Sequence, residues 1–142
     1  RQLMASKPVA ADVEIEEFDY THVMTTEKLL KDYDNYKIVD VRTDEEYEGA
    51  ILYSEAQGGH LPGAIHIRYT DLFQEDGTLK PNEELTKMFE DAGLSKEDAI
   101  VTYCTGGIRS SYMQLVLEMC GFENSYNYDQ SFWRWAVVGE VE

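Results

Sequence analysis

Basic side chains are scarce in this chain of 142 residues. It carries 12 Lys and Arg against 28 Asp and Glu, which gives a formal net charge of −16 at pH 7. Proteins that bind nucleic acid gather positive side chains against the phosphates, so this composition argues against nucleic acid as a partner. We interpret the acidic residues, which recur along the chain, as a solvated surface. A docking face for a basic partner is the alternative.

The chain also lacks a long apolar run. No stretch approaches the roughly 18 consecutive apolar residues that a membrane-spanning helix needs, so the sequence predicts no membrane partner. Hydrophobic residues make up 43% of the chain and charged residues 28%, values typical of a globular domain. Residues 1–19 combine Pro8 with small and acidic residues and little periodicity. We therefore expect a tail or linker over residues 1–19 and one folded domain over residues 20–142.

Only two cysteines are present, Cys104 and Cys120, which is too few for a disulfide framework. A helix over residues 109–120 would separate them by roughly 16 Å along its axis, so a bridge between them is geometrically poor. Cys120 lies in an apolar run and is expected in the core. The three histidines have no metal-ligand spacing with the cysteines, and we expect neither a metal nor a cofactor.

Short apolar stretches alternate with helical patterns along the folded part. Residues 99–103 show no polar face, which indicates a central strand covered on both sides. Residues 109–119 are apolar nearly all round and predict a buried helix. Asn82 is expected to cap another helix, and Trp133 and Trp135 are expected in the core. The alternation predicts an α/β fold with a largely parallel sheet and helices on both faces. The expected strands are 38–41, 64–67, 99–103 and 125–128, and the expected helices are 26–33, 44–47, 82–92, 109–119 and 132–137.

Residues 101–111 carry the strongest functional signal. They are predicted to form a buried strand, a Gly-rich turn and a helix, with Cys104 at the end of the strand and Arg109 at the start of the helix. Ligands of parallel sheets bind beyond the carboxyl ends of the strands. The backbone N–H groups of the turn and the helix N-terminus behind it would stabilise an anion. A thiol held there ionises readily, so the sequence predicts a nucleophilic sulfur in an anion pocket that needs no histidine base.

Three stretches of the chain, in this order and spacing, match the motifs of a known family. They resemble the first motif, the second motif and the active-site loop of the rhodanese domain, which is the sulfurtransferase fold. The stretches are Val39-Asp40-Val41-Arg42-Thr43-Asp44-Glu45-Glu46-Tyr47, Gly59-His60-Leu61-Pro62-Gly63-Ala64-Ile65 and Cys104-Thr105-Gly106-Gly107-Ile108-Arg109-Ser110. The tail at residues 128–135 and the insert before His60 also resemble tandem-domain sulfurtransferases. The chain is therefore expected to be either a single-domain protein or the C-terminal domain of a tandem one.

The resemblance implies a rhodanese-like three-layer fold and a sulfurtransferase activity. Cys104 would take a sulfane sulfur from a small anionic donor, such as thiosulfate, a polysulfide or mercaptopyruvate, and carry it as a persulfide. A thiol or cyanide, or a thiol on a protein, would then accept the sulfur. Asp40 and Arg42 would be structural, bracing the first strand against the loop. The residues implied in donor binding are Thr105, Gly106, Gly107, Ile108, Arg109 and Ser110.

Two other functions occur on the same fold. Phosphatases and arsenate reductases of this type have five residues between the cysteine and the arginine, whereas four separate Cys104 from Arg109 here. Binding or regulatory modules usually lack the cysteine. Glu46 stands where tandem enzymes tend to carry Arg, and Gly106 where they carry Lys or Ser, so the donor stays open. A working thiol favours the reducing cytoplasm.

Overall fold

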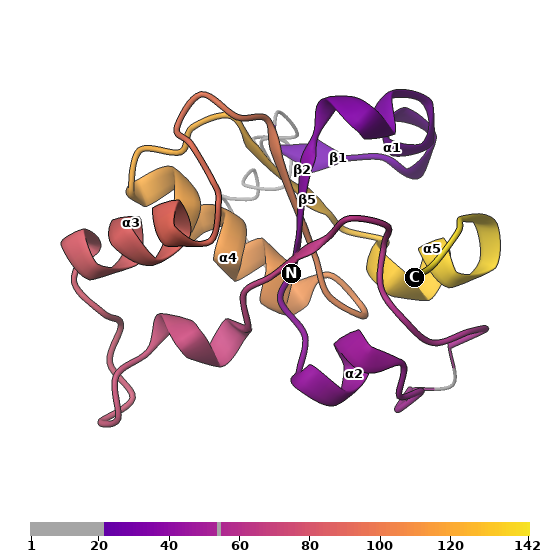
Figure 1. The fold of residues 1–142 in the computed structure, drawn as a ribbon, viewed down its shortest axis with the longest axis horizontal. Coiled ribbons are helices and arrows are strands. Elements are labelled where there is room, and N and C mark those ends of the chain that lie inside the picture. The colour runs from indigo at the N-terminus through magenta and orange to yellow at the C-terminus, as the bar shows by residue number, and fades with distance from the viewer. Residues whose placement is uncertain (1–21, 54) are drawn as a thin grey trace, which may run out of the picture.

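Five parallel strands form one sheet in this computed structural model, which describes residues 22–53 and 55–142 (Figure 1). The strand order is β1-β5-β4-β2-β3, so β4 lies at the centre. Every neighbouring pair is parallel, and the predicted α/β fold is confirmed. The predicted tail over residues 1–19 lies outside the described residues. The strands are β1 (Val23–Met24), β2 (Lys37–Asp40), β3 (Ile65–His66), β4 (Ile100–Tyr103) and β5 (Ser125–Tyr128).

The sheet separates two apolar cores, because successive side chains of a strand point to opposite faces. Val39 and Ile100 pack with helices α3 and α4 on one face. Ile38 and Val101 pack with helices α1 and α5 on the other, which gives the predicted three layers (Figure 1). The helices are α1 (Thr26–Asp32), α2 (Asp44–Glu48), α3 (Asn82–Asp91), α4 (Ile108–Met119) and α5 (Ser131–Val138), with 3-10 turns η1 (Tyr33–Asn35) and η2 (Tyr69–Leu72). None of these helices is long and apolar enough to cross a membrane.

The expected cap of helix α3 is wrong by one residue. Asn82 is the first helical residue, and Pro81 occupies the N-cap position with an extended backbone. The reason is that the carbonyl of Pro81 accepts the N–H of Leu85 at 3.0 Å, so the first helical hydrogen bond closes on Pro81.

Helix α4 is buried on one face only, contrary to the prediction. Met113 and Leu117 are fully buried, whereas Leu115 is 56% and Met119 49% exposed. The helix packs against the sheet, and no other described element covers its outer face, so apolar composition alone overstated its burial.

The two tryptophans of helix α5 differ in the same way. Trp135 is buried in the core, but Trp133 is 50% exposed, so its predicted core position is wrong. The two residues are two positions apart, and such residues of a helix do not share a face. Cys120 is buried in the core as predicted, and both cysteines are free thiols.

Candidate active site

Cys104 directly follows the central strand β4, at the carboxyl edge of the sheet. Four residues later the chain enters helix α4, whose N-cap is Gly107 with φ of 98°. Only glycine fits this position, because a Cβ on Gly107 would lie 2.3 Å from the carbonyl oxygen of Asp129. This tight turn places the N-terminus of helix α4 against the sulfur of Cys104.

Two groups contact the sulfur of Cys104. The N–H of Gly107 donates to Sγ at 3.0 Å, and the hydroxyl of Ser110 lies 3.6 Å from it. Burial raises the pKa of the Cys104 thiol, but hydrogen bonds from Ser110 and Gly107 and the positive charge of Arg109 outweigh it. The pKa is therefore lowered from its ordinary value, in the direction that a thiolate nucleophile requires. Among the described residues, no hydrogen bond joins Sγ to the N–H of Thr105 or Gly106. Fewer backbone N–H groups therefore contact the sulfur than the sequence predicted.

Asn127 supports this arrangement from strand β5. Its Oδ1 lies 2.6 Å from the hydroxyl oxygen of Ser110, and its Nδ2 donates to the carbonyl of Gly107 at 3.3 Å. Asn127 therefore fixes both groups that contact the sulfur. Asn127 was not among the predicted site residues, because its only signal in the sequence is a polar residue within a buried strand.

Glu46 reaches the active-site loop from helix α2. It is 1% exposed, and its Oε2 accepts the hydroxyl of Thr105 at 2.9 Å. Its Oε1 accepts Nη1 of Arg109 at 3.4 Å. Burial raises the pKa of the Glu46 carboxyl, but hydrogen bonds from Thr43 and Thr105 and the charge of Arg109 leave it lowered. Glu46 is thus an ionised carboxylate that contacts the loop. The sequence did not predict its contacts with Thr105 and Arg109.

Asp40 and Arg42 form a fully buried ion pair of 2.8 Å at the end of strand β2. Nη2 of Arg42 also donates to the carbonyl of Gly59 at 2.6 Å, and its guanidinium lies 4.2 Å from the ring of Phe132. The pair therefore connects strand β2 to residues 49–60 and to helix α5. It makes no direct hydrogen bond to the Cys104 loop within the described residues.

The start of helix α5 positions the Cys104 loop through hydrogen bonds to the backbone of Cys104. Ser131 adopts φ of 52°, which is rare for a residue with a side chain. Its hydroxyl accepts the N–H of Cys104 at 3.2 Å and donates to the carbonyl of Tyr128 at 2.6 Å. The N–H of Phe132 donates to the carbonyl of Cys104 at 2.9 Å. Ser131 is a further site residue that the sequence analysis missed.

A cavity of about 410 Å³ opens onto the sulfur. Arg109 is the one cationic side chain in its lining, and Tyr53 and Ile108 form apolar walls. The full lining consists of Tyr53, Cys104, Thr105, Gly106, Ile108 and Arg109. The structure therefore brings most of the predicted loop residues to one cavity, while Gly107 and Ser110 contact the sulfur from beneath.

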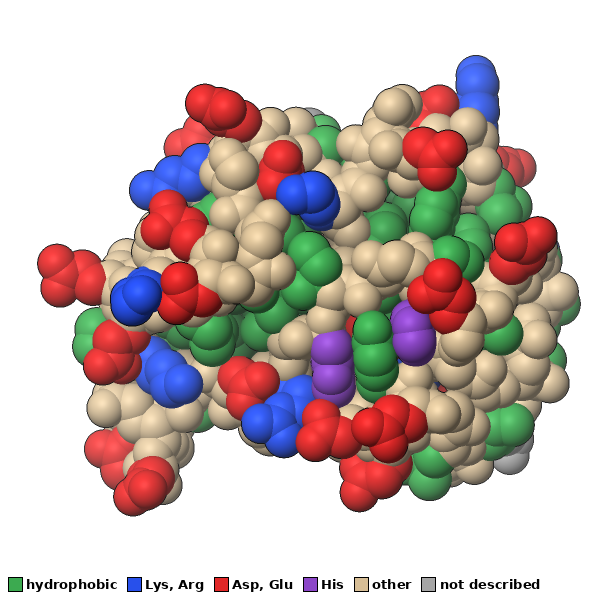
Figure 2. Space-filling view, in the orientation of Figure 1, with side chains coloured by type: hydrophobic (Ala, Val, Ile, Leu, Met, Phe, Trp, Pro, Cys, Tyr) green, Lys and Arg blue, Asp and Glu red, His purple; other side chains and the backbone are tan. Residues whose placement is uncertain are grey.

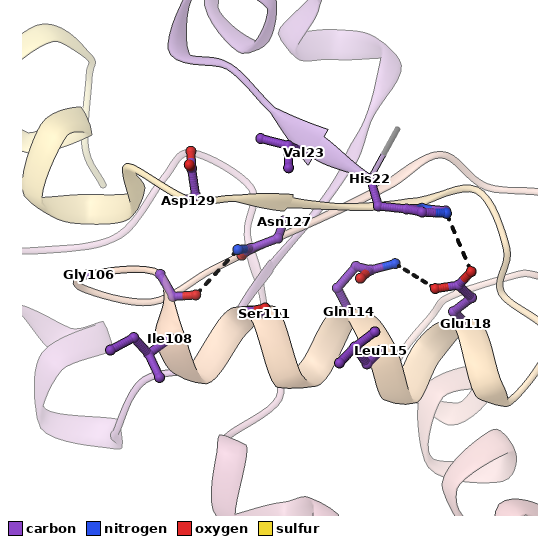
Figure 3. Close-up of a pocket in the computed structure, with 11 residues that line it drawn as sticks. His22, Val23, Gly106, Ile108, Ser111, Gln114, Leu115, Glu118, Asn127 and Asp129 are labelled. Carbon is purple, nitrogen blue, oxygen red and sulfur yellow. Dashed lines mark hydrogen bonds and ion pairs between the residues drawn. The ribbon is translucent and has the colours of Figure 1, made fainter. Parts of the chain in front are cut away.

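A second cavity of about 700 Å³ lies along helix α4 beside strands β1 and β5 (Figure 3). Gly106 and Ile108 border both cavities, but Cys104 does not line this one. At one end, Nε2 of His22 lies 3.3 Å from Oε2 of Glu118. Within residues 22–53 and 55–142, no group of three or more His, Cys, Asp or Glu side chains is placed to hold a metal ion.

Comparison with known proteins agrees with this fold and this loop. Residues 25–137 match the family model of the rhodanese-like domain. A curated relative from Mycolicibacterium smegmatis, "Putative thiosulfate sulfurtransferase", is 41% identical over 112 residues, which is 73% of this chain and 39% of the relative. A relative of the same name from Haloferax volcanii is 38% identical over 110 residues, 72% of this chain and 38% of the relative. The chain thus spans about two fifths of the length of these relatives.

Solved structures share the fold. An EanB variant in complex with hercynine superposes with a TM-score of 0.77 at 19% sequence identity, covering 85% of this chain and 31% of that one. Another EanB variant, with ergothioneine covalently linked to a persulfide cysteine, gives a TM-score of 0.75 at 19% identity, again over 85% of this chain and 31% of that one. At these identities the likeness shows the fold alone. The family match covers most of the chain and includes Cys104 and its loop, and the chain belongs to the rhodanese-like domain family.

Proposed function

We propose that this chain is a sulfurtransferase in which Cys104 carries the transferred sulfur as a persulfide. The observation that carries the proposal is the position of Sγ, 3.0 Å from the N–H of Gly107 at the N-terminus of helix α4. The relatives' names support the reaction type. The small loop supports sulfur over a larger tetrahedral oxyanion, because only four residues separate Cys104 from Arg109.

The reaction takes two steps. The Cys104 thiolate attacks the outer sulfur of the donor, so that a new S–S bond forms while the donor's own bond to that sulfur breaks and its electron pair leaves with the remainder of the donor. The persulfide then carries a terminal sulfur that a thiolate or cyanide attacks, and the electron pair of the S–S bond returns to Cys104 as thiolate. The Gly107 N–H and the helix N-terminus stabilise the anionic sulfur in both steps.

Mass spectrometry of the protein after exposure to a sulfane donor tests the proposal. We expect one added sulfur on Cys104 and its loss when cyanide is added. Cys104→Ser should gain no sulfur, because a hydroxyl is not ionised near neutral pH and does not form the persulfide. Cys120→Ser is the matched control, since Cys120 lies in the core away from the loop, and it should still gain the sulfur. Transfer activity retained by Cys104→Ser would refute the assignment.

A further inference from the structure

The hydroxyl group of Ser110 has more acceptors than it can serve. Its oxygen lies 2.6 Å from Oδ1 of Asn127, 3.2 Å from the carbonyl oxygen of Gly107 and 3.6 Å from Sγ of Cys104. A serine hydroxyl carries one proton. Ser110 and Asn127 are both buried, where an acceptor left without a donor costs free energy. The contact with Asn127 is the shortest of the three, so in this geometry Asn127 receives the proton.

The amide of Asn127 is held in the orientation that accepts this proton. Its Nδ2 donates to the carbonyl of Gly107 at 3.3 Å, and the side chain points from strand β5 toward the turn (Figure 3). Exchanging the two ends of the amide would place two acceptor oxygens against each other at Gly107. The main-chain N–H of Asn127 also donates to the carbonyl of His22 at 2.7 Å. The amide oxygen therefore faces Ser110.

The sulfur competes for the same proton only in one of its chemical states. A thiol, or a sulfur already bonded to a second sulfur, is neutral and accepts weakly, whereas a thiolate is an anion and accepts strongly. When the Ser110 hydroxyl turns to the thiolate, the buried Oδ1 of Asn127 loses its donor, which costs free energy. Part of what the thiolate gains from Ser110 is therefore lost at Asn127.

We propose that Asn127 is a positioning residue that acts on Cys104 through Ser110. Asn127 holds the Ser110 hydroxyl while Sγ is neutral, as in the thiol or the persulfide, and releases it to Sγ when the thiolate forms. The proton stays on the Ser110 oxygen throughout, so only the hydrogen bond changes its acceptor. The part that concerns the persulfide rests on the proposed sulfur transfer, and the part that concerns the thiolate does not.

This competition affects the two half-reactions in opposite directions. A thiolate that receives fewer hydrogen bonds is more basic and therefore more nucleophilic, so Asn127 favours the attack of Cys104 on the donor. In the second step the Cys104 thiolate is the leaving group, and a more basic thiolate leaves more slowly. Removal of the Asn127 amide should therefore slow the loading of sulfur and accelerate its release.

The charges around the sulfur stay constant in the tests of this proposal. Acidic side chains are spread over the visible face of the molecule (Figure 2), and the chain has a net charge of −16. Each variant exchanges one neutral side chain for another, so this charge does not change. The ionisable groups near the loop are those of Tyr53 before strand β3, Asp40 and Arg42 at the end of strand β2, Glu46 of helix α2, Arg109 of helix α4 and Asp129 after strand β5.

The thiolate part is tested with Asn127→Leu, which keeps the branch at Cγ and the number of side-chain heavy atoms but removes both polar atoms. The measurement is the rate of alkylation by iodoacetamide against pH, with Cys120→Ser present so that Cys104 is the only thiol. We expect the midpoint to fall by about one pH unit, a tenfold change in the thiolate equilibrium. An unchanged or higher midpoint would overturn the proposal.

Gln114→Leu is the matched control for the loss of a buried amide. Gln114 lies on helix α4 and is 5% exposed, and its Nε2 donates to the carbonyl of Ser125 at 3.3 Å. Its replacement should leave the Cys104 midpoint where it is in the wild type. An equal fall of the midpoint in Gln114→Leu and Asn127→Leu would mean that any buried amide of this region has the effect, which contradicts the specific role of Asn127.

A second substitution separates this role from a purely structural one. Ser110→Ala removes the hydroxyl for which Asn127 and the sulfur compete. With Ser110→Ala present, Asn127→Leu should leave the midpoint unchanged, because no hydroxyl proton remains to be released. An equal fall with and without the Ser110 hydroxyl would show that Asn127 acts on the sulfur by another route, and the proposal would be wrong.

A measurement on protein with native Asn127 covers the case in which Asn127→Leu does not fold. NMR signals of the Asn127 side-chain amide are followed through the Cys104 titration, with those of Gln114 as the reference. They should move with the Cys104 midpoint in the wild type and move much less in Ser110→Ala, where the thiolate still forms. An equal response in both proteins would mean that the thiolate charge alone moves the signals, which contradicts the change of acceptor.

The persulfide part is tested by following the two half-reactions separately, at a pH above both midpoints where Cys104 is fully ionised. Loading by thiosulfate should slow by about threefold in Asn127→Leu, the factor expected for a thiolate about one pH unit less basic, and release to cyanide should accelerate. A loss in both steps indicates a damaged site and overturns this part. If no donor places a sulfur on Cys104, the proposed function fails and the persulfide part with it, while the alkylation profile still decides the thiolate part.

Discussion

Two buried groups, the sulfur of Cys104 and the carboxylate of Glu46, lie at the active-site loop. The Glu46 carboxylate and the backbone N–H of Cys104 are held by polar contacts from residues distant in the chain, whereas the sulfur contacts Gly107 and Ser110 of its own loop. Glu46 and Thr105 are 59 positions apart, and Cys104 and Ser131 are 27 apart. The loop is therefore positioned by side chains from helices α2 and α5 as well as by its own backbone.

The reactivity of Cys104 should extend to lower pH than that of a free cysteine. Its pKa is lowered in the folded protein, so the thiolate persists as the pH falls below the free value of about 8.5. The check is the rate of alkylation by iodoacetamide against pH in Cys120→Ser, where Cys104 is the only thiol. A midpoint below the free value is expected, and unfolding in denaturant should return it to that value. A folded-state midpoint at or above the free value would mean that the donors do not stabilise the thiolate.

Among the site residues, the sequence could predict those that are contiguous in the chain and few others. Cys104, its loop and Arg109 lie together in the chain, so their chemistry was visible as a motif. Asn127 and Ser131 contact the loop only because strand β5 and helix α5 return beside strand β4. Glu46 is a departure from the family pattern that the sequence shows. Its burial and its contacts with Thr105 and Arg109 depend on the tertiary structure, so the sequence did not predict them.

Among the elements, the turn from strand β4 into helix α4 carries a steric constraint at Gly107, its left-handed glycine. Gly107→Ala should destabilise the protein by about 1–3 kcal/mol more than Gly93→Ala, the range typical of overpacking. The two glycines have similar φ values, 98° and 107°, but an added Cβ meets the carbonyl of Asp129 only at Gly107. Chemical denaturation of both variants measures the difference. Equal destabilisation would show that backbone strain, rather than the close approach of Asp129, constrains the turn.

The length of the same turn should select the chemistry of the site. Inserting one Gly between Gly107 and Ile108 moves helix α4 away from the sulfur, so the anion loses charge-assisted hydrogen bonds worth about 1.5–3 kcal/mol each. We expect sulfur transfer to slow by about a hundredfold and inorganic phosphate to become an inhibitor. A Gly inserted after Gly77, in an exposed turn, is the control and should change neither. Unchanged transfer and no phosphate effect would mean that loop size does not select sulfur.

Most of the elements could be predicted because each has a local signal, but the two-residue strand β1 was not among the expected strands. The apolar strand β4 lies at the centre of the sheet as predicted, and Thr25 caps helix α1 by accepting the N–H of Lys28 at 3.1 Å. Burial of helix faces was predicted less well. Met119 and Trp133 are exposed although their segments are apolar, because composition does not show which side of a helix another element covers.

Across the whole molecule, Arg42 connects strand β2, the segment that ends at Gly59, and helix α5. Its ion pair with Asp40 lies at the end of strand β2. Its hydrogen bond to the carbonyl of Gly59 holds the segment that carries Tyr53. The ring of Phe132 contacts its guanidinium from helix α5. Because this cluster is fully buried, its loss cannot be compensated by water.

Arg42→Met should therefore destabilise the protein by about 3–5 kcal/mol, the range for breaking a buried pair and leaving one charge unpartnered. Arg68→Met is the matched control, because Arg68 pairs with Asp71 at 2.9 Å on the surface, where solvent screens the charges. Its denaturation midpoint should hardly move. Asp40→Asn combined with Arg42→Met removes both charges and should recover part of the loss. If Arg42→Met and Arg68→Met shift the midpoint equally, the buried cluster does not hold strand β2, residues 49–60 and helix α5 together.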